Sequence, residues 1–262
     1  MSKAIVFTSG KGGVGKSTLT LSVGRALAEI GCRVALIDTD IGLNNLDVLM
    51  SVEHSIIYDL TDVIENRCRL SQALIEDKLT RGLFLLPSAH SYEQCHADGQ
   101  SLKEVVSRLK STFDYVIIDC PAGIEFGFHR AVAAADEAVV VTSSHLSALK
   151  DASKVAGLIR SYMMPVRLVI NRVRGDMLLS GDTLSVEEIR SAMNVDVLGV
   201  VPEDDDMNMV SSGGRVVRKS DGWSAVKLLA HNIYSASGEI YDVTKKYRGL
   251  FGGIKRKLRG KV

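Results

Sequence analysis

A glycine-rich stretch at 9–18, SGKGGVGKST, directly follows a short apolar run and limits the possible folds of this chain more than any other feature. It matches the pattern G-x-x-x-x-G-K-[ST] of a phosphate-binding loop, and the segment after it has the spacing of a helix. Glycines let such a loop curl until its N–H groups point at phosphate oxygens, and the helix dipole adds positive potential there. The stretch therefore predicts a nucleoside triphosphate site rather than an ordinary turn between a strand and a helix.

The residue types in this loop predict their roles. Lys16 supplies a mobile positive charge for the β- and γ-phosphates, and the Ser17 hydroxyl is suited to ligate Mg²⁺. Lys11 is a second lysine in the loop, and its residue type fits either a solvated charge or another phosphate-directed cation. The predicted nucleotide contacts in the loop are Gly10, Lys11, Gly12, Gly13, Val14, Gly15, Lys16, Ser17 and Thr18.

The segments around the loop predict an α/β fold. Apolar runs at 4–8 and 33–38 flank a helical pattern at 16–30, and a strand–helix–strand unit of this length makes its two strands parallel. Further short apolar runs raise the total to about seven strands. We expect a single doubly wound, mostly parallel sheet with helices on both faces, as in P-loop NTPases. Two more helices are expected at 71–77 and 223–247.

Acidic residues follow two of the expected strands. Asp38 and Asp40 come after the second strand, and Asp119 ends the apolar run YVIID. The carboxyl ends of parallel strands form the edge at which open α/β sheets bind ligands. Asp119 is therefore predicted beside Mg²⁺, and Asp38 or Asp40 could hold a metal-bound water or orient the attacking water. The alternative for Asp38 and Asp40 is capping of turn amides.

Two later strand ends carry candidate contacts for the base. Asn171 could use its side-chain amide to recognise the edge of an adenine, although an Asn at a strand end can equally cap a turn. Its neighbour Arg172 and the more distant Pro202 are further candidate contacts to the nucleotide.

The C-terminal segment 245–262 differs in charge from the rest of the chain. It holds eight Lys or Arg and no Asp or Glu, so the remaining residues have a net charge of −7 although the whole chain has +1. This acidic remainder argues against non-specific nucleic-acid binding by the body, and no specific nucleic acid is expected. We expect an ATPase domain at 1–244 and a separate basic tail at 245–262.

Apolar side chains in this tail recur at helical spacing. At ~100° per residue they fall in a sector about 100° wide, with the cations outside it, which is typical of a helix in a membrane interface. Gly252 and Gly253 disfavour a helix in water, so we expect the tail to fold on an anionic membrane surface. A solvated tail, a helix packed on the body and a nucleic-acid-binding tail are the alternatives. The residues of the stripe are Tyr247, Leu250, Phe251, Ile254 and Leu258.

Other features point to a cytoplasmic protein. No stretch approaches the ~20 continuous apolar residues of a spanning helix. The four cysteines are far apart and lack metal-site spacing, so free thiols are expected. Together with the tail, these features predict a cytoplasmic protein that lies peripherally on the inner face of the cell membrane.

The assembled motifs resemble the MinD family, the septum-site-determining ATPases within the larger ParA/MinD group with a deviant Walker A loop. The resemblance covers nearly the whole chain in the family's order. It implies ATP and Mg²⁺ as cofactors. The motifs that carry it are SGKGGVGKST, DTDIGLNNLD, VIIDCPAGIE, the Ile170-Asn171-Arg172 triplet, VPEDD and the basic amphipathic end.

The resemblance also implies roles for single residues. Lys11 would reach across a dimer interface to the partner's nucleotide, and Asp40 would position the attacking water. Asp38 and Asp119 would support the metal, and Asn171 would contact adenine. One departure is His145, because the family often has a glutamate near that position that holds the signature lysine in the absence of ATP.

The function implied by the resemblance is a slow, partner-activated ATPase that forms a homodimer with ATP. It would recruit a MinC-type division inhibitor to the membrane and respond to a MinE-type activator. One alternative is a ParA-type DNA partition ATPase, which needs a basic patch on its body. Another is a non-hydrolysing scaffold that keeps ATP as a structural ligand. An electron carrier of the nitrogenase-reductase type would need cluster-binding cysteines, for which Cys95 and Cys120 lack the sequence context.

Overall fold

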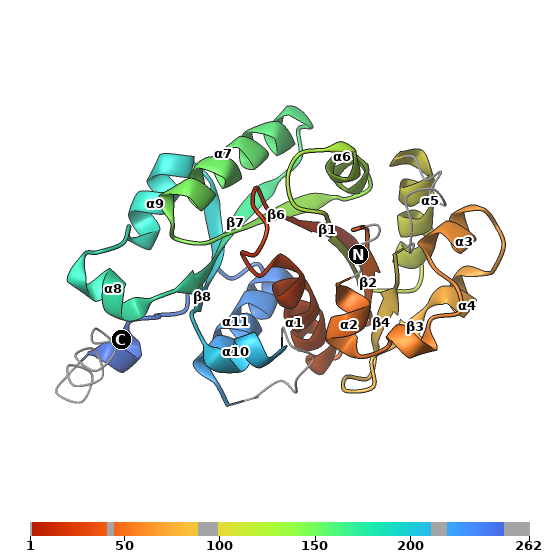
Figure 1. The fold of residues 1–262 in the computed structure, drawn as a ribbon, viewed down its shortest axis with the longest axis horizontal. Coiled ribbons are helices and arrows are strands. Elements are labelled where there is room, and N and C mark those ends of the chain that lie inside the picture. Colours follow the sequence, from red (N-terminus) through yellow and green to blue (C-terminus); the bar gives the residue numbers. More distant parts are fainter. Residues whose placement is uncertain (1, 41–44, 89–98, 211–218, 249–262) are drawn as a thin grey trace.

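A computed structural model describes residues 2–40, 45–88, 99–210 and 219–248 of the chain. One eight-stranded sheet runs through the molecule in the order β3-β4-β2-β5-β1-β6-β7-β8 (Figure 1). Every neighbouring pair is parallel except β3 with β4, so the predicted doubly wound, mostly parallel sheet is confirmed. The strands are β1 (Lys3–Thr8), β2 (Val34–Asp38), β3 (Ile75–Glu76), β4 (Leu83–Leu86), β5 (Tyr115–Asp119), β6 (Glu137–Thr142), β7 (Val166–Val173) and β8 (Asp196–Pro202).

Helices cover both faces of the sheet, and each face has its own apolar core. Helices α5, α6, α7 and α9 lie over one face, and α1, α10 and α11 lie over the other (Figure 1). The α-helices are α1 (Lys16–Glu29), α2 (Leu46–Met50), α3 (Leu60–Ile64), α4 (Leu70–Ala73), α5 (Gly99–Lys110), α6 (Phe126–Ala133), α7 (Leu146–Ser161), α8 (Gly175–Ser180), α9 (Val186–Met193), α10 (Asp205–Val210) and α11 (Asp221–Ser235).

The strand order brings the predicted phosphate loop and the acidic strand ends together. Strand β1 lies between β5 and β6, where the direction of winding reverses and α/β sheets bind their ligands. Asp119 at the end of β5 is in register with Phe7 of β1 and with Asp38 of β2. The first phosphate-loop residues and two of the predicted metal-supporting carboxylates therefore share one edge of the sheet.

Two helix predictions were wrong in extent. The helix expected at 71–77 is a short α4 followed by strand β3, which pairs antiparallel with β4 at the edge of the sheet. The helix expected to reach Tyr247 ends at Ser235, because Ala236 adopts a left-handed conformation with φ 56°.

The chain beyond α11 packs back against the body and holds the first residues of the predicted tail in place. The Tyr241 hydroxyl donates to Asp221 Oδ1 at 2.9 Å, and Lys246 Nζ lies 3.0 Å from Asp221 Oδ2. A 3₁₀ turn, η3 (Lys245–Tyr247), then packs beside α8. The contacts show that residues up to this turn belong to the folded body.

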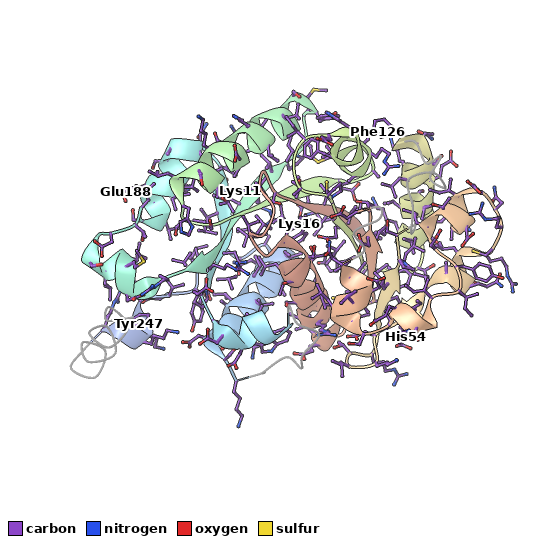
Figure 2. The ribbon with its side chains drawn as sticks, viewed as in Figure 1. Lys11, Lys16, His54, Phe126, Glu188 and Tyr247 are labelled. Carbon is purple, nitrogen blue, oxygen red and sulfur yellow. The ribbon has the colours of Figure 1, made fainter. Side chains whose placement is uncertain are left out.

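The burial of Tyr247 corrects its assignment to the exposed apolar stripe. Its side chain is 6% exposed and lies at the edge of the molecule beside α8 (Figure 2). A Cβ on Gly175 would lie 2.1 Å from the Val243 carbonyl oxygen and 3.1 Å from the Tyr247 ring, so only glycine allows this close packing. The other stripe residues lie outside the described residues. They are Leu250, Phe251, Ile254 and Leu258.

None of the helices within the described ranges combines the length and the apolar character needed to cross a bilayer.

Candidate functional site

The predicted phosphate loop forms a cradle between β1 and α1. Gly13 and Gly15 have φ values of 78° and 88°, in the left-handed region that favours glycine. The loop borders a cleft of about 470 Å³, whose other walls include Asp40 and Arg172. The cradle and the cleft together have the form of a nucleotide phosphate site.

Gly10 lies where the loop touches α7. A Cβ at this position would lie 2.5 Å from the backbone carbon of Asp151, so the loop packs directly on the helix backbone. Gly12, two residues later, has no described atom within 4 Å of its would-be Cβ. The two glycines therefore differ in whether a side chain can be accommodated.

We expect Gly10→Ala to lower the free energy of unfolding by about 1–3 kcal/mol, because neither backbone can move away without strain. For a chain of this size that is a fall of ~2–4 °C in melting temperature per kcal/mol. Gly12→Ala is the matched control and should melt close to the wild type. Thermal unfolding of the nucleotide-free protein tests both, and equal melting temperatures would contradict the tight packing at Gly10.

Asn171 fastens the loop to the end of β7. Its Nδ2 donates to the Val14 carbonyl at 2.8 Å, and the side chain is 6% exposed. A Cβ on Gly15 would lie 2.5 Å from this Nδ2, so the second loop glycine also makes room for Asn171. One N–H of the amide is thus engaged by the loop, while the second N–H and the oxygen Oδ1 are left for the predicted adenine contact, which stays a prediction.

The predicted base contacts gather beside Asn171. Asn171, Arg172 and Pro202 line one small cavity next to the phosphate cleft, together with Asp204. Arg172 has a left-handed φ of 56° at an irregularity in the pairing of β7 with β8. Such strain in a residue other than glycine is typical of ligand sites.

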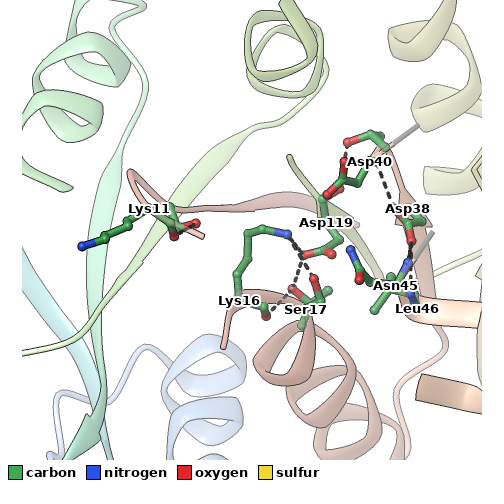
Figure 3. A network of polar contacts seen from close by, with 11 residues as sticks. Lys11, Lys16, Ser17, Asp38, Asp40, Asn45, Leu46 and Asp119 are labelled. Atoms are coloured by element: carbon green, nitrogen blue, oxygen red, sulfur yellow. Dashed lines mark hydrogen bonds and ion pairs between the residues drawn. The ribbon is translucent and has the colours of Figure 1, made fainter. Parts of the chain in front are cut away.

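A buried ion pair occupies the centre of the site. Lys16 Nζ lies 2.8 Å from Asp119 Oδ1, and the two side chains are 8% and 0% exposed (Figure 3). Lys16 also donates to Ser17 Oγ at 3.2 Å. Burial opposes the charge on Lys16, but the attraction and hydrogen bond of Asp119, together with the nearby Cys120 and Asp38, outweigh this effect and raise the pKa of the lysine. Lys16 therefore stays cationic across the physiological range.

The second carboxylate oxygen of Asp119, Oδ2, is buried and has no hydrogen-bond partner among the described residues; we call it the open oxygen. A buried anionic oxygen without a partner is unfavourable unless a ligand satisfies it. With the Ser17 hydroxyl it offers the hard oxygen ligands that Mg²⁺ prefers. The residues present therefore fit a Mg²⁺ site.

The described residues hold no group of three or more His, Cys, Asp or Glu side chains that could bind a metal by themselves.

Asp38 makes the contacts of a turn cap. Its Oδ1 accepts from the Asp40 N–H at 2.9 Å, and its Oδ2 accepts from the N–H groups of Asn45 at 3.0 Å and Leu46 at 3.1 Å. Burial, with the nearby charge of Asp119, raises the pKa of Asp38 to about 7. The geometry favours the capping alternative, and support of the metal by Asp38 stays a prediction.

Asp40 lines the cleft and lies above Asp119 in Figure 3. Burial raises its pKa, and the charge of Lys16 partly offsets this effect. The residue is half-buried, so its carboxylate can meet both the cleft and solvent. Its predicted role in orienting water stays a prediction.

Lys11 lies on the opposite side of the loop from Lys16. Its side chain points away from Lys16, and its Nζ donates to Ser147 Oγ on α7 at 3.4 Å (Figure 3). It lines a separate cleft of about 360 Å³ together with His145. The histidine that departs from the family pattern therefore borders the same cleft as Lys11, and its Nδ1 lies 3.1 Å from Ser143 Oγ.

Three contacts that hold Asp119 and the loop were not predicted from the sequence. The Thr20 hydroxyl lies 2.9 Å from Asp119 Oδ1, and the Thr39 hydroxyl donates to the Asp119 carbonyl at 2.7 Å. The Ser9 carbonyl accepts from the N–H of Gly123 at 2.9 Å. Thr20 could have been found, since a residue four positions after Lys16 lies on the same helix face.

Comparisons with known proteins agree with this geometry. Residues 2–167 match the family described as an AAA domain. The chain is 43% identical over 261 residues to the septum site-determining protein MinD of Bacillus subtilis, with 97% of each chain covered.

Solved structures resemble the fold closely. A chain of the MinC:MinD cell division protein complex of Aquifex aeolicus has a TM-score of 0.83 and 36% identity, covering 90% of this chain and 97% of that one. The septum site-determining protein MinD complexed with Mg-ADP from Pyrococcus horikoshii has a TM-score of 0.81 and 30% identity, covering 91% and 98%.

Proposed function

Because the chain belongs to the MinD family of septum site-determining proteins, we propose that it is an ATP-dependent, dimerising ATPase that acts at the membrane. It helps to place the division septum by recruiting a division inhibitor of the MinC class. The observation that carries this proposal is the buried ion pair between Lys16 of the glycine loop and Asp119, whose second oxygen is the open oxygen. Lys16 supplies the cation for the phosphates, and the open oxygen of Asp119 supplies an oxygen for Mg²⁺ and its bound ligands.

The residues of the cleft divide the chemistry among them. The loop amides and Lys16 bind and orient the phosphates, while Ser17 and Asp119 hold Mg²⁺. When bound, Mg²⁺ neutralises charge on the transferring phosphoryl group. We assign Asp40, which lines the same cleft, to orient the attacking water. Catalysis in this site rests on positioning and electrostatics.

Lys11 is suited to act on a second copy of the chain. It is exposed and lies outside the cleft that contains Lys16. An exposed cation on the outer side of the loop can reach a nucleotide that faces it across a dimer. We therefore assign Lys11 to the nucleotide of the partner subunit, which makes the homodimer a product of ATP binding.

The basic tail provides the membrane anchor. Four apolar side chains remain in the stripe after Tyr247 is removed, and partial burial of each would contribute roughly 4 kcal/mol in total. Each Lys or Arg near an anionic surface adds up to about 1 kcal/mol. One tail is then a marginal anchor, whereas two tails on one dimer bind far more tightly because the second inserts at a high effective concentration.

The packing of the first tail residues sets the boundary between the body and the anchor. A boundary after Thr244 would cut off η3 and uncover the surface on which Tyr247 packs. We therefore place the start of the anchor after Arg248. The partner proteins that we propose at the membrane are a MinC-type inhibitor and a MinE-type activator.

The ATP hydrolysis rate, measured with and without anionic vesicles, tests this proposal on the full chain and on a chain that ends at Arg248. We expect vesicles to raise the rate of the full chain, because dimers concentrate on the surface, and to leave the rate of the shortened chain unchanged. Vesicles of neutral phosphatidylcholine are the matched control. Equal stimulation of both chains would contradict the anchor, and absence of hydrolysis under every condition would favour the scaffold alternative.

A further inference from the structure

Thr20 lies one turn of α1 beyond Lys16 and is completely buried. Its hydroxyl lies 2.9 Å from Asp119 Oδ1 and 3.0 Å from the carbonyl oxygen of Lys16. A hydroxyl has one proton and therefore donates to one of these two acceptors at a time. The carboxylate is the stronger acceptor, since hydrogen bonds to ionised groups are shorter and stronger than neutral ones.

The backbone of Asp119 is already fixed by its neighbours. It is in register with Phe7 and Asp38, and its carbonyl oxygen accepts from both the N–H and the hydroxyl of Thr39. The remaining freedom is the rotation of the Asp119 side chain. That rotation decides which of its two oxygens faces the metal shell.

Among the described residues, the side chains of Lys16 and Thr20 contact Asp119 Oδ1, and they differ in their other contacts. Lys16 Nζ is 2.8 Å from this oxygen, but it is also the cation that our proposed function assigns to the phosphates. Thr20 is buried in the helix, and its hydroxyl lies against Asp119 and the Lys16 carbonyl. When Lys16 serves the phosphates, Thr20 is the donor that stays on Oδ1.

We propose that Thr20 is a positioning residue for the Mg²⁺ site. Its hydroxyl holds Asp119 through Oδ1, so that the open oxygen faces the bound Mg²⁺ and its ligands. The inference rests on the proposed nucleotide site and adds a residue to it. A purely structural alternative exists, because Thr hydroxyls in helices commonly donate to the carbonyl four residues earlier. The two roles differ in what happens to Mg²⁺ when the hydroxyl is removed.

A Mg²⁺ titration of the complex with a fluorescent ADP analogue separates these roles without relying on hydrolysis. We expect Thr20→Val, which keeps the shape but removes the donor, to raise the half-saturating Mg²⁺ concentration about 10–100-fold, as is usual for loss of an outer-shell partner. Binding of the analogue in EDTA should change less than threefold, because the loop amides are intact. Thr20→Ser keeps the hydroxyl and should restore Mg²⁺ affinity to near the wild-type value.

Thr61→Val is the matched control. Thr61 is also buried, on α3, and its hydroxyl has no hydrogen-bond partner within the part of the chain that the structure covers. This variant should leave the Mg²⁺ titration unchanged, so any effect of Thr20→Val is not a general effect of losing a buried hydroxyl.

Two outcomes would overturn the inference. One is a Thr20→Val protein that binds Mg²⁺ like the wild type. The other is a Thr20→Val protein whose analogue binding in EDTA weakens by the same factor as its Mg²⁺ affinity, which is the result expected if the hydroxyl only supports the helix. Failure of the wild type itself to bind the analogue would instead contradict the proposed function.

Discussion

Replacing Lys16 with alanine should reduce ATP hydrolysis by at least about 100-fold, the usual effect of removing one preorganised group that stabilises the transition state. The expectation follows from the position of Nζ, which lies beside Ser17 and Asp119 in the cleft bordered by the glycine loop. A steady-state phosphate-release assay measures this loss.

The same substitution should also destabilise the nucleotide-free protein. It leaves Asp119 buried without its cation, and removing one partner of a buried ion pair usually costs about 3–5 kcal/mol. Asp119→Asn in the Lys16→Ala background removes the uncompensated charge. The double variant should therefore regain much of the lost free energy of unfolding but none of the hydrolysis. Hydrolysis by Lys16→Ala near the wild-type rate would contradict the assignment, and so would a double variant as unstable as the single one.

Lys11→Ala should separate nucleotide binding from dimerisation. Lys11 lies on the outer side of the loop against Ser147, so its loss should leave ADP affinity within about twofold of the wild type. The ATP-dependent dimer should disappear, and hydrolysis should fall by at least about 100-fold, because a transition-state cation supplied across the interface is lost. Analytical ultracentrifugation with ADP and with a slowly hydrolysed ATP analogue measures the dimer.

Ser147→Ala is the control for the resting contact of Lys11. The bond between them is exposed and 3.4 Å long, so its removal should have little effect on either ADP affinity or dimerisation. If Lys11→Ala weakens ADP binding as strongly as it weakens the dimer, Lys11 serves its own subunit and the shared-site interpretation is wrong.

The parts of the fold that could be predicted depend on local signals. The loop, the helix after it and the strands on either side follow from a motif of fixed spacing and from apolar periodicity. Asp119 could be placed at the sheet edge because an apolar strand ends there. Strand β3 could not be predicted, because two residues are too few to show an apolar period. Their pairing with β4 is a contact that exists only in the folded chain.

The end of α11 and the burial of Tyr247 show the same limit. Apolar residues continue past Ser235 at a spacing that suggests a helix, yet Val243 and Tyr247 are buried by packing against the α8 region. The helical pattern that placed Tyr247 in the membrane stripe cannot distinguish a ring that faces lipid from one that fills the space over Gly175. That distinction needs the contact between segments more than 60 residues apart in the sequence.

Lys16, Ser17 and Asp119 were predicted to lie together, and Lys16 does contact both of the others. The hydrogen bonds around them were not predicted. The capping role of Asp38 and the hydrogen bond of Thr20 to Asp119 depend on side-chain geometry after folding, so a sequence motif does not reveal them.

The central claim is that the identity of the bound nucleotide, ATP or ADP, decides whether one tail or two reach the membrane. Co-sedimentation with vesicles that contain anionic lipid tests it most directly, with the full chain in ATP, the full chain in ADP, and Lys11→Ala in ATP. We predict that the ATP-loaded full chain binds at least about 100-fold more tightly than the ADP-loaded chain, as expected for two linked anchors, and that Lys11→Ala in ATP binds like the ADP-loaded chain. Equal binding in ATP and ADP would contradict the account.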